Sequence, residues 1–598
     1  MHMRLPCLWS SHAKPSVSTI KVMKPDGSEF SSISDRADYI NHYFTTIASN
    51  LVSNSSIFSH LPARVSDSPC KFTLASVTIS EVSAVIKSLK GKSSTDVLGI
   101  SVKALKCCAN ELAPFLCTYI NKSFESGIFP DDLKKAKVIP ILKKKVSPLE
   151  VTSYRPISIL PALSKVYEKI VKTRLLEYIT ANKLINPHQH GFLPKHNTET
   201  AIADFTMSII RALDKGVYVA GILLDLSKAF DTVDHSILLG KLSNIGVQGN
   251  ALNWFKSYLT NRTQAVEITA FCRSSNRIST SVSSFLPINI GVPQGSILGP
   301  LLFLIYINDL PISLNPANSK SVLYADDANI LMFGKNPDEL ESNAQCKLES
   351  LLSYFNSNKL SLNISKTVGM NFQLRNTKND PPLEINGSQI CFKTESNFLG
   401  VTLDTRLTWQ DHCKDLCNRL SSICFSQRII CRVCSPYISR ITYFAYFQSL
   451  VSYGIIFWGS SKQNLNLVFK VQKRCLRIME RVSPRASCRP LFSKLTILPV
   501  PCIFILRVVL FIRDHPEIFP PHSVPHSYST RSQATIHIDH FKTALRERNI
   551  EVQGVRIYNY LPVAVKNETC PKKFKSLLLE FLHDHRFYSL EEYFSFSP

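Results

Sequence analysis

The chain has 598 residues, enough for several domains, and 44% of them are hydrophobic, so a large buried core is possible. Lys and Arg exceed Asp and Glu by 24, which favours a polyanionic partner, nucleic acid before an acidic membrane surface. The most apolar stretch, Ile503–Ile512, is too short to cross a bilayer, so we expect no membrane segment.

Seventeen cysteines are scattered without a regular framework, and residues 1–20 do not resemble a signal peptide. We therefore expect reduced thiols in the nucleus or cytoplasm. Two spacings are compatible with zinc, Cys413 with Cys417 and Cys431 with Cys434, near His412. Helical or buried thiols are the commoner explanation, and we adopt it.

Residues 1–79 are polar and Ser-rich, and we expect a connector that is partly disordered, with one better segment at Tyr39–Ser49. We find no catalytic constellation there. Apolar residues at helical spacing predict two helices within Thr78–Ser126. Lys134–Lys145 predicts a short strand between Lys clusters, which suits either a solvated basic face or a phosphate-contacting strand.

An extended segment, Ser153–Ser158, follows and carries Arg155 directly before a proline. The guanidinium fork suits a triphosphate, although a structural ion pair would use it equally well. Helices are predicted over residues 161–179 and 197–213.

The continuous apolar run Val217–Leu226 predicts a buried strand, and its one charge, Asp225, lies near the end. A carboxylate there is costly unless it is paired or bound to a metal. We interpret Asp231 and Asp234 as start residues of the next helix.

An aromatic helix near residues 254–258 and several strands lead to the turn Gly291–Ser296, which contains Gln294 and Gly295. Gly295 would let the backbone approach a ligand closely. A strongly apolar helix, Leu298–Leu310, comes next.

The segment Ser321–Phe333 predicts two strands and a tight turn that carries Asp326 and Asp327. Taken alone, such a pair is more often a solvated turn than a metal site. Further on we expect a helix over Asp338–Asn358, a strand after Lys366, and a hairpin near residues 390–403.

Residues 409–481 are helical and basic with interleaved aromatic side chains, which either helix packing or contact with a nucleic-acid duplex would explain. Residues 515–540 are rich in Pro, His and Ser and are predicted to form a linker. A small basic C-terminal module with a helix at Phe574–Leu582 follows.

Three carboxylates now stand out, Asp225 after one buried strand and Asp326 and Asp327 on a later hairpin. Two metal ions ~3.5–4 Å apart can activate a 3′ hydroxyl and stabilise a leaving pyrophosphate. Magnesium suits a site made of a few carboxylates and substrate phosphates.

The ordered motifs resemble the reverse transcriptases of non-LTR (LINE-type) retrotransposons, closest to the Jockey and CR1 branches. The resemblance covers about residues 80–480 and extends weakly to 554–562, where Tyr558-Asn559 replaces the family's Trp-Asn. The matching segments are Ser153–Ser158, Gln189–Phe192, Leu224–His235, Gly291–Pro300, Tyr324–Asp327, Leu362–Thr367 and Phe398–Gly400.

The resemblance implies an α+β right-hand polymerase with an antiparallel palm sheet. Fingers would span 80–215, the palm 216–405 and a helical thumb 406–485, followed by a linker and C-terminal module at 486–598. It implies an RNA-directed DNA polymerase that uses two Mg²⁺ ions, with Mn²⁺ as a substitute. Its partners would be an RNA template, a DNA primer and dNTPs, with neither a membrane nor an obligate protein partner.

Individual roles carry over by motif. Asp225, Asp326 and Asp327 would bind the metals, with Asp327 the least direct. Lys366 would donate a proton to pyrophosphate, and Arg155 would hold the triphosphate.

Three further residues would contact the nucleotides. Phe230 matches the aromatic residue that rejects a ribose 2′ hydroxyl. Gln294 and Gly295 would lie against the templating base and the incoming nucleotide.

Full-length members of this family carry an N-terminal endonuclease. Residues 1–79 resemble the family's connector instead, so we expect a truncated or remnant copy that lacks this nuclease and does not start its own insertion. A catalytically silent nucleic-acid-binding remnant is the main alternative. A group II intron maturase-like splicing factor fits the surroundings of Asp225 and Gln294 less well.

Overall fold

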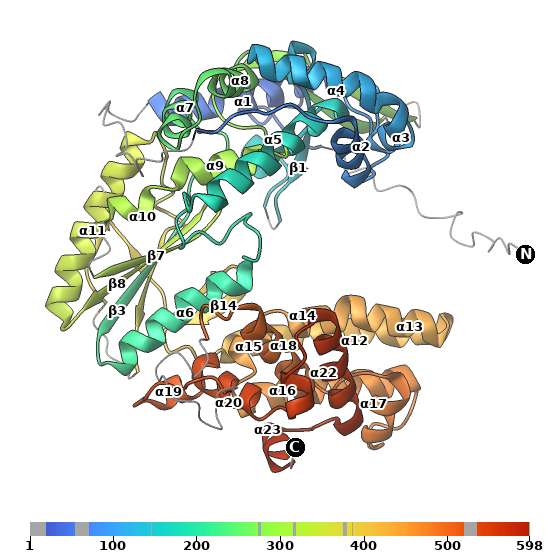
Figure 1. Cartoon of the computed structure of the whole chain (residues 1–598), viewed down its shortest axis with the longest axis vertical. Helices are drawn as coiled ribbons and strands as arrows, with labels where there is room; N and C mark the ends of the chain where they lie inside the picture. Colours follow the sequence, from blue (N-terminus) through green and yellow to red (C-terminus); the bar gives the residue numbers. More distant parts are fainter. Residues whose placement is uncertain are drawn as a thin grey trace, which may run out of the picture.

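The computed structural model describes residues 20–53, 71–144, 146–272, 277–314, 318–374, 380–385, 387–519 and 535–596. The chain forms an open C, with two lobes joined on one side by a sheet (Figure 1). The upper lobe includes α2 (Ile79–Ser88), α4 (Ala109–Ser126), α5 (Ala162–Ala181) and α8 (Gly249–Leu259). The lower lobe begins at α12 (Gln410–Val433) and is almost wholly helical. The α+β prediction is confirmed, and the two lobes and the sheet between them give the chain its open shape.

The central sheet has the strand order β12-β9-β3-β8-β7. Its strands are β3 (Tyr218–Leu224), β7 (Ser319–Tyr324), β8 (Asp327–Gly334), β9 (Val368–Phe372) and β12 (Cys391–Phe392). All neighbours pair antiparallel except β12 with β9, which run parallel. The predicted antiparallel sheet is therefore present, with one parallel strand at its edge.

The middle strand β3 is buried on both faces, which explains its continuous apolar sequence. Val219 and Leu223 pack in the core shared with α6 (Thr198–Asp214) and the lower lobe. Ala220 and Ile222 point the other way, into the core shared with α11 (Pro337–Ser357) and the upper lobe. Side chains alternate across a strand, so one strand serves both cores.

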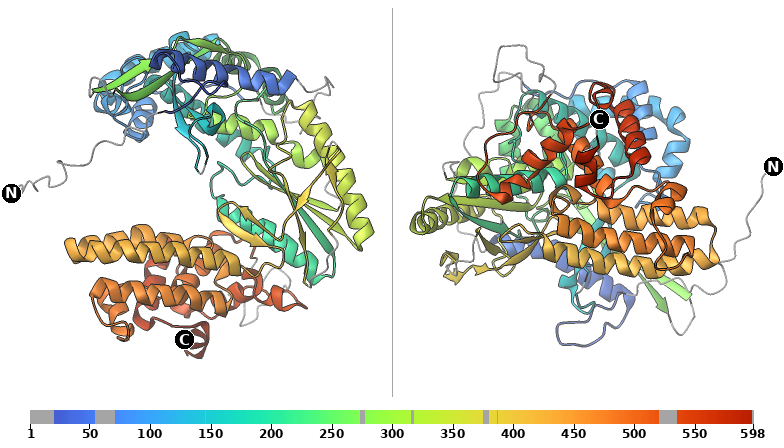
Figure 2. Two further views of the ribbon diagram at one scale, coloured as in Figure 1. Left: turned by 180° about the vertical axis from the view of Figure 1, so that it is seen from behind. Right: turned by 90° about the horizontal axis from the view of Figure 1, so that it is seen from below.

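A second sheet lies in the upper lobe, with the strand order β2-β1-β4-β5 and β6 beside β4. It combines β1 (Lys135–Leu142) and β2 (Tyr154–Ile159) with β4 (Arg262–Cys272), β5 (Arg277–Val282) and β6 (Leu286–Ile288). Strands β1 and β2 precede residue 215, where the predicted fingers end, and β4, β5 and β6 follow it. The sheet thus combines strands from the predicted fingers and the predicted palm. The helix α1 (Ile33–Ser53) packs on this sheet and lies across the upper lobe when seen from behind (Figure 2).

The lower lobe packs α12 against α16 (Lys462–Glu480), and α16 against α18 (Val500–Asp514). The C-terminal helix α22 (Pro571–His585) contains the predicted segment Phe574–Leu582 and packs on α18. The lobe also contacts α6: the Asp214 carboxylate accepts hydrogen bonds from the Thr543 amide at 2.8 Å and its hydroxyl at 2.7 Å.

The prediction of helical or buried thiols is confirmed for three of the four cysteines. Cys413, Cys417 and Cys431 lie within α12, and Cys413 and Cys431 are buried, whereas Cys434 follows the helix and is exposed. Burial lowers the pKa of His412 to about 4. The described residues contain no zinc-type cluster.

No single helix among the described residues is long and apolar enough to cross a membrane. The bent pair Arg489–Leu495 and Val500–Asp514 passes by length and composition alone, and its second helix is largely buried in the lower lobe. Residues 520–534 of the predicted linker, and 1–19 and 54–70 of the predicted connector, lie outside the described residues.

The upper lobe depends on an aromatic cluster around Trp254, which is fully buried. Its ring lies 5.4 Å from Phe129 and 5.7 Å from Tyr258. We expect Trp254→Ala to cost about 3–5 kcal/mol of local stability, because a large cavity would remain. Hydrogen exchange of the α4 and α8 amides measures this loss. Phe115→Ala on α4 changes a side chain that is 66% exposed. It should change the free energy of exchange of the same amides by less than about 0.5 kcal/mol.

Candidate active site

Three aspartates meet at one end of the central sheet. Asp225 directly follows β3, whose last residue, Leu224, pairs with Ala328 of β8. Asp327 is the residue before Ala328, and Asp326 lies in the two-residue turn between β7 and β8. The register therefore sets Asp225 beside the hairpin that carries the other two carboxylates.

The loop after α11 holds Asp225 from the other side. The Asn363 amide donates to the Asp225 carbonyl at 2.8 Å, and the Ser227 amide donates to the Ser361 carbonyl at 2.8 Å. This pairing brings Lys366 to the site, with its Nζ 3.3 Å from Asp225 Oδ2. Both side chains are partly exposed, so the ion pair adds only about 0–1 kcal/mol and can readily be exchanged for other partners.

The three carboxylates repel one another. Burial raises the pKa of Asp326, and the charge of Asp225 raises it further while Arg155 opposes the shift. Burial and the charges of Asp326 and Asp225 raise the pKa of Asp327 to about 6. The raised pKa values of Asp326 and Asp327 thus come first from burial and then from the charges of the neighbouring carboxylates.

Cations from three separate segments surround the carboxylates. Arg155 is exposed on β2, within electrostatic range of Asp326. Burial lowers the pKa of Lys143, and the nearby cations Lys228, Lys366 and Arg155 lower it further. The site thus holds a cluster of carboxylates beside a cluster of cations.

The Lys-rich segment before Arg155 divides between two roles. Lys134 is buried and pairs with Asp131 at 2.7 Å, so its role is structural. Lys143, in contrast, faces the candidate site through its electrostatic neighbours. Composition alone could not separate these two lysines.

The turn at Gln294 and Gly295 lies directly against β2. The Ser158 amide donates to the Gln294 carbonyl at 2.8 Å. A Cβ on Gly295 would lie 2.4 Å from the Ser158 carbonyl oxygen, and its φ of +130° disfavours any other residue. The glycine therefore serves the contact between this turn and β2, which carries Arg155.

Phe230 joins the same group through the backbone, because its carbonyl accepts a hydrogen bond from the Val292 amide at 2.8 Å. Its half-buried ring packs on Phe303, with ring centroids 4.7 Å apart. The structure thus gathers all eight predicted site residues around one end of the central sheet and the adjoining β2.

One sequence interpretation is wrong. Asp234 does cap α7 (His235–Asn244), accepting hydrogen bonds from the amides of the next helical residues at 2.9 and 3.0 Å. Asp231 does not start that helix: it lies in the preceding turn and accepts a hydrogen bond from the Gln294 side-chain amide at 2.8 Å. Burial raises the pKa of Asp231.

A buried glutamine supports the turn between β7 and β8. Gln189 Oε1 accepts hydrogen bonds from the Gly191 amide at 2.7 Å and from the Ala325 amide at 3.2 Å. Ala325 has a φ of +57°, which is unfavourable for a residue with a side chain. The sequence motif around Gln189 therefore has a local structural use that its composition did not reveal.

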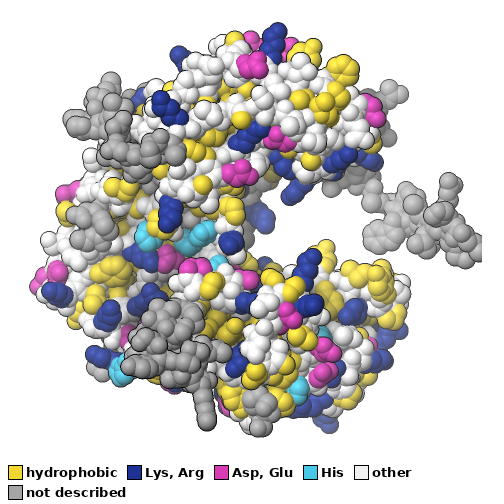
Figure 3. Space-filling view, in the orientation of Figure 1, with side chains coloured by type: hydrophobic (Ala, Val, Ile, Leu, Met, Phe, Trp, Pro, Cys, Tyr) yellow, Lys and Arg dark blue, Asp and Glu magenta, His cyan; other side chains and the backbone are white. Residues whose placement is uncertain are grey.

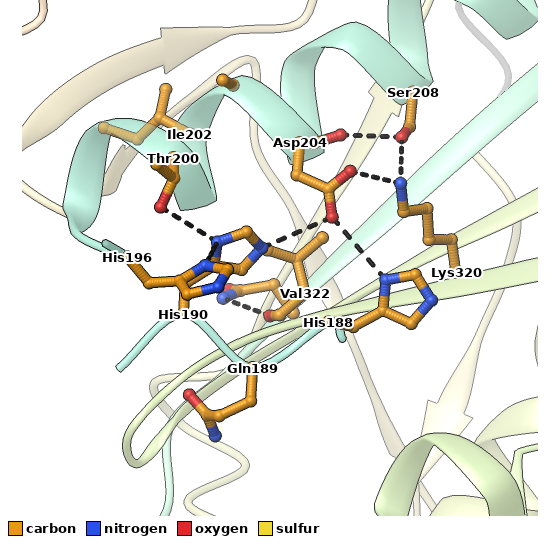
Figure 4. A network of polar contacts seen from close by, with 12 residues as sticks. His188, Gln189, His190, His196, Thr200, Ile202, Asp204, Ser208, Lys320 and Val322 are labelled. Atoms are coloured by element: carbon orange, nitrogen blue, oxygen red, sulfur yellow. Dashed lines mark hydrogen bonds and ion pairs between the residues drawn. The ribbon is translucent and has the colours of Figure 1, made fainter. Parts of the chain in front are cut away.

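The residues on either side of Gln189 are tied to α6 by a polar network (Figure 4). Asp204 lies 3.7 Å from His188 and 3.5 Å from His190, and it also pairs with Lys320 of β7. Burial alone would raise the pKa of Asp204, but the hydrogen bonds from both histidines and the charge of Lys320 lower it strongly. The network anchors the Gln189 segment and β7 to one helix.

The described residues contain no ready-made group of three or more His, Cys, Asp or Glu that could hold a metal ion. The donor chemistry nevertheless fits a hard divalent cation, because carboxylate oxygens are its preferred ligands. A cation here would also relieve the repulsion that raises the pKa values of Asp326 and Asp327.

A deep hollow opens between the two lobes, and Lys and Arg side chains lie on both of its walls (Figure 3). In the lower lobe, α12 exposes Arg419, Arg428 and Arg432. The basic surplus of the chain therefore contributes to the walls of this hollow, as a polyanionic ligand would require.

Comparison with known families identifies the central part of the chain. Residues 141–403 match the family described as reverse transcriptase (RNA-dependent DNA polymerase). All eight predicted site residues fall in this range. Polymerases of this family generally use divalent metal ions.

Similar proteins come from insect mobile elements. The chain is 29% identical over 411 residues to the probable RNA-directed DNA polymerase from transposon BS of Drosophila melanogaster, covering 67% of this chain and 44% of that protein. It is 30% identical over 344 residues to that of the mobile element jockey of the same species, covering 57% of this chain and 36% of the relative. The chain thus spans less than half the length of these relatives.

Solved structures give weaker similarity. Telomerase from Candida albicans, in complex with a fragment of telomeric RNA, has a TM-score of 0.34 at 11% identity, covering 64% of this chain and 70% of that one. Apo telomerase from Candida tropicalis has a TM-score of 0.31 at 13% identity, covering 46% and 55%.

We predict that Asp327 titrates near pH 6. The folded state holds this proton more tightly than an unfolded chain, whose value is 3.8. The contribution to the free energy of unfolding should therefore fall as the pH rises from about 4 to about 6. Carboxyl NMR of ¹³C-aspartate-labelled protein measures the midpoint. Asp326→Asn should move it to lower pH, and so should added Mg²⁺. A wild-type midpoint near 4 would contradict the prediction.

Proposed function

We propose that the chain is an RNA-directed DNA polymerase, because residues 141–403 match the reverse transcriptase family. It would join a dNTP to the 3′ hydroxyl of a primer paired with an RNA template. The observation that carries this proposal is the meeting of Asp225, Asp326 and Asp327 at the end of the central sheet, beside a cluster of cations.

Asp225 and Asp326 would be the main ligands of the divalent ions, with Mg²⁺ preferred and Mn²⁺ as a substitute. Asp327 would act behind them. Two such ions lower the barrier of an in-line phosphoryl displacement by stabilising the attacking and leaving oxygens. The protein keeps the carboxylates in place through the β3–β8 register and through Gln189 behind the turn.

The cations would bind and orient the triphosphate. Arg155 offers a fork of donors that matches phosphate oxygens, and Lys143 carries a charge that its cationic neighbours already disfavour. Lys366 lies 3.3 Å from Asp225 and is well exposed. It would hold a proton for the leaving pyrophosphate.

The nucleotide itself would lie against the group formed by Phe230, Gln294 and Gly295. The contact of Phe230 with Phe303 limits where its ring can move. A fixed ring beside the sugar would leave little room for a 2′ hydroxyl. Gly295 would let the backbone turn approach the base pair while it stays packed on β2.

The hollow between the lobes would hold the template and primer. In the lower lobe, α12 exposes Phe425, Ile429 and Val433 among its arginines, and Tyr437 is exposed on the next helix, α13 (Pro436–Thr442). Apolar and basic side chains together suit the sugars and phosphates of a duplex.

The free thiols of the described residues, such as Cys424 and Cys475, agree with a nuclear or cytoplasmic location.

We expect Asp326→Ala to lower DNA primer extension on an RNA template with Mg²⁺ by about 10³-fold, because metal stabilisation of the displacement is worth several kcal/mol. Gel-resolved extension measures this effect. Asp411→Ala, at a half-exposed aspartate on α12, should leave primer extension at the wild-type level. Extension that survives the loss of Asp326 would refute the site. A folded wild type that binds RNA without extending would favour the silent remnant.

Phe230→Val should increase the use of ribonucleotides relative to deoxyribonucleotides by about tenfold or more, because a smaller side chain admits the 2′ hydroxyl. Competition between a dNTP and the matching rNTP in single-nucleotide extension measures the ratio. Phe230→Tyr keeps the ring and should keep the preference. An unchanged ratio in the valine variant would place the sugar elsewhere.

A further inference from the structure

The helix α1 lies outside residues 141–403, yet it is fixed firmly to the upper-lobe sheet. The Asn41 side-chain amide donates to the Gln264 backbone carbonyl at 3.2 Å, and the Gln264 side-chain amide donates to Asn41 Oδ1 at 3.1 Å. Asn41 also donates to the Ser284 carbonyl at 2.9 Å, and Asp38 accepts from the Ser284 amide at 2.9 Å. These buried and partly buried bonds set the rotation of α1 on the sheet.

That rotation places two aromatic rings of α1 beside Lys228. The Lys228 Nζ lies 5.4 Å from the Tyr43 ring centroid and 5.8 Å from the Phe44 ring centroid. Both distances are within the range of cation–π attraction. Lys228 follows the candidate metal ligand Asp225 by three residues, so α1 reaches the active site through this lysine.

The backbone also shows that Lys228 is held in place. It has a φ of +53°, in the left-handed region that is unfavourable for a residue with a side chain. Its carbonyl accepts a hydrogen bond from the Asp231 amide at 2.8 Å. Backbone strain of this kind persists where the surrounding structure enforces it, and it is frequent at functional sites.

The same contacts extend to the predicted nucleotide-binding turn. Burial raises the pKa of Tyr43, as do the nearby Tyr39 and Asp231. Asp231 in turn accepts the hydrogen bond from Gln294. Tyr43 therefore lies at one end of a short series of contacts that runs through Lys228 and Asp231 to Gln294.

The charge balance indicates what Lys228 would bind. Burial lowers its pKa, and only Asp231 partly compensates. Lys228 also lowers the pKa of Lys143, together with Arg155 and Lys366. Four cations this close repel one another, and a ligand with several negative charges would relieve the repulsion.

We propose that α1 is part of the nucleotide-binding site, where Tyr43 and Phe44 hold the Lys228 ammonium against the triphosphate of the incoming nucleotide. This inference rests on the proposed polymerase function. Lys228 is the binding residue, and the two rings are positioning residues. The segment predicted to be a connector without catalytic features thus contributes to substrate binding.

The first test is steady-state primer extension at varied dNTP. The double variant Tyr43→Leu/Phe44→Leu should raise the KM for dNTP about fivefold and leave kcat within about twofold, because a lost cation–π contact is worth ~1 kcal/mol. The single variant Tyr43→Phe retains both rings and should keep the wild-type KM. A general packing defect would instead lower kcat and stability together, and an unchanged KM would overturn the proposal.

A cycle with Lys228→Met shows whether the rings act through the lysine. Lys228→Met alone should raise the KM by at least the same factor, and adding the ring variant to it should raise the KM no further. Effects that multiply would mean that α1 and Lys228 act independently, which contradicts the inference.

The second test does not need catalysis. Acetylation of lysines in the wild-type protein without primer, read by mass spectrometry, reports Lys228 directly. Added dATP with Mg²⁺ should slow acetylation of Lys228 at least threefold, and leave the exposed Lys572 of α22 unchanged. No protection of Lys228 would overturn the inference. Protection without extension by the wild type would retain it and reject the polymerase function.

Discussion

The site depends on the pairing of β3 with β8, in which Leu224 lies opposite Ala328. A shift of one residue in a strand moves every side chain to the other face. Because β3 is buried on both faces, such a shift would place the wrong side chains in both cores at once. The register is therefore strongly specified, and only this register brings Asp225 to the hairpin that carries Asp326 and Asp327.

The charges at this end of the sheet are unfavourable in the absence of ligands. The pKa of Asp327 is raised by burial and its acidic neighbours, and the pKa of Lys143 is lowered by burial and its basic neighbours. Carboxylates that repel one another thus lie beside cations that repel one another. A ligand that brings both metal cations and phosphates fits this arrangement. The stability needed to hold them comes from elsewhere, from the two hydrophobic cores and from backbone contacts such as that of Gly295 on β2.

Sequence patterns predicted the strands whose neighbouring residues along the chain are buried together. The apolar runs before Asp225 and around Asp326 revealed the strands, since a buried strand needs apolar residues on both faces. They did not separate Lys134 from Lys143, or Asp231 from Asp234, because each member of these pairs has a similar neighbourhood along the chain. Their roles follow from contacts with residues far away in sequence, such as Gln294 for Asp231.

The helix α6 connects the β7–β8 hairpin to the lower lobe. Asp204 on one part of the helix pairs with Lys320 of β7 and with the histidines beside Gln189. Near its start, Glu199 pairs with Arg507 of α18 and accepts from the Gly454 amide at 3.3 Å. A movement of the lower lobe onto a bound duplex would therefore act on the same rigid helix that supports the turn at Asp326. Helix α1 has the corresponding place in the upper lobe, between the sheet that it covers and the Lys228 side of the site.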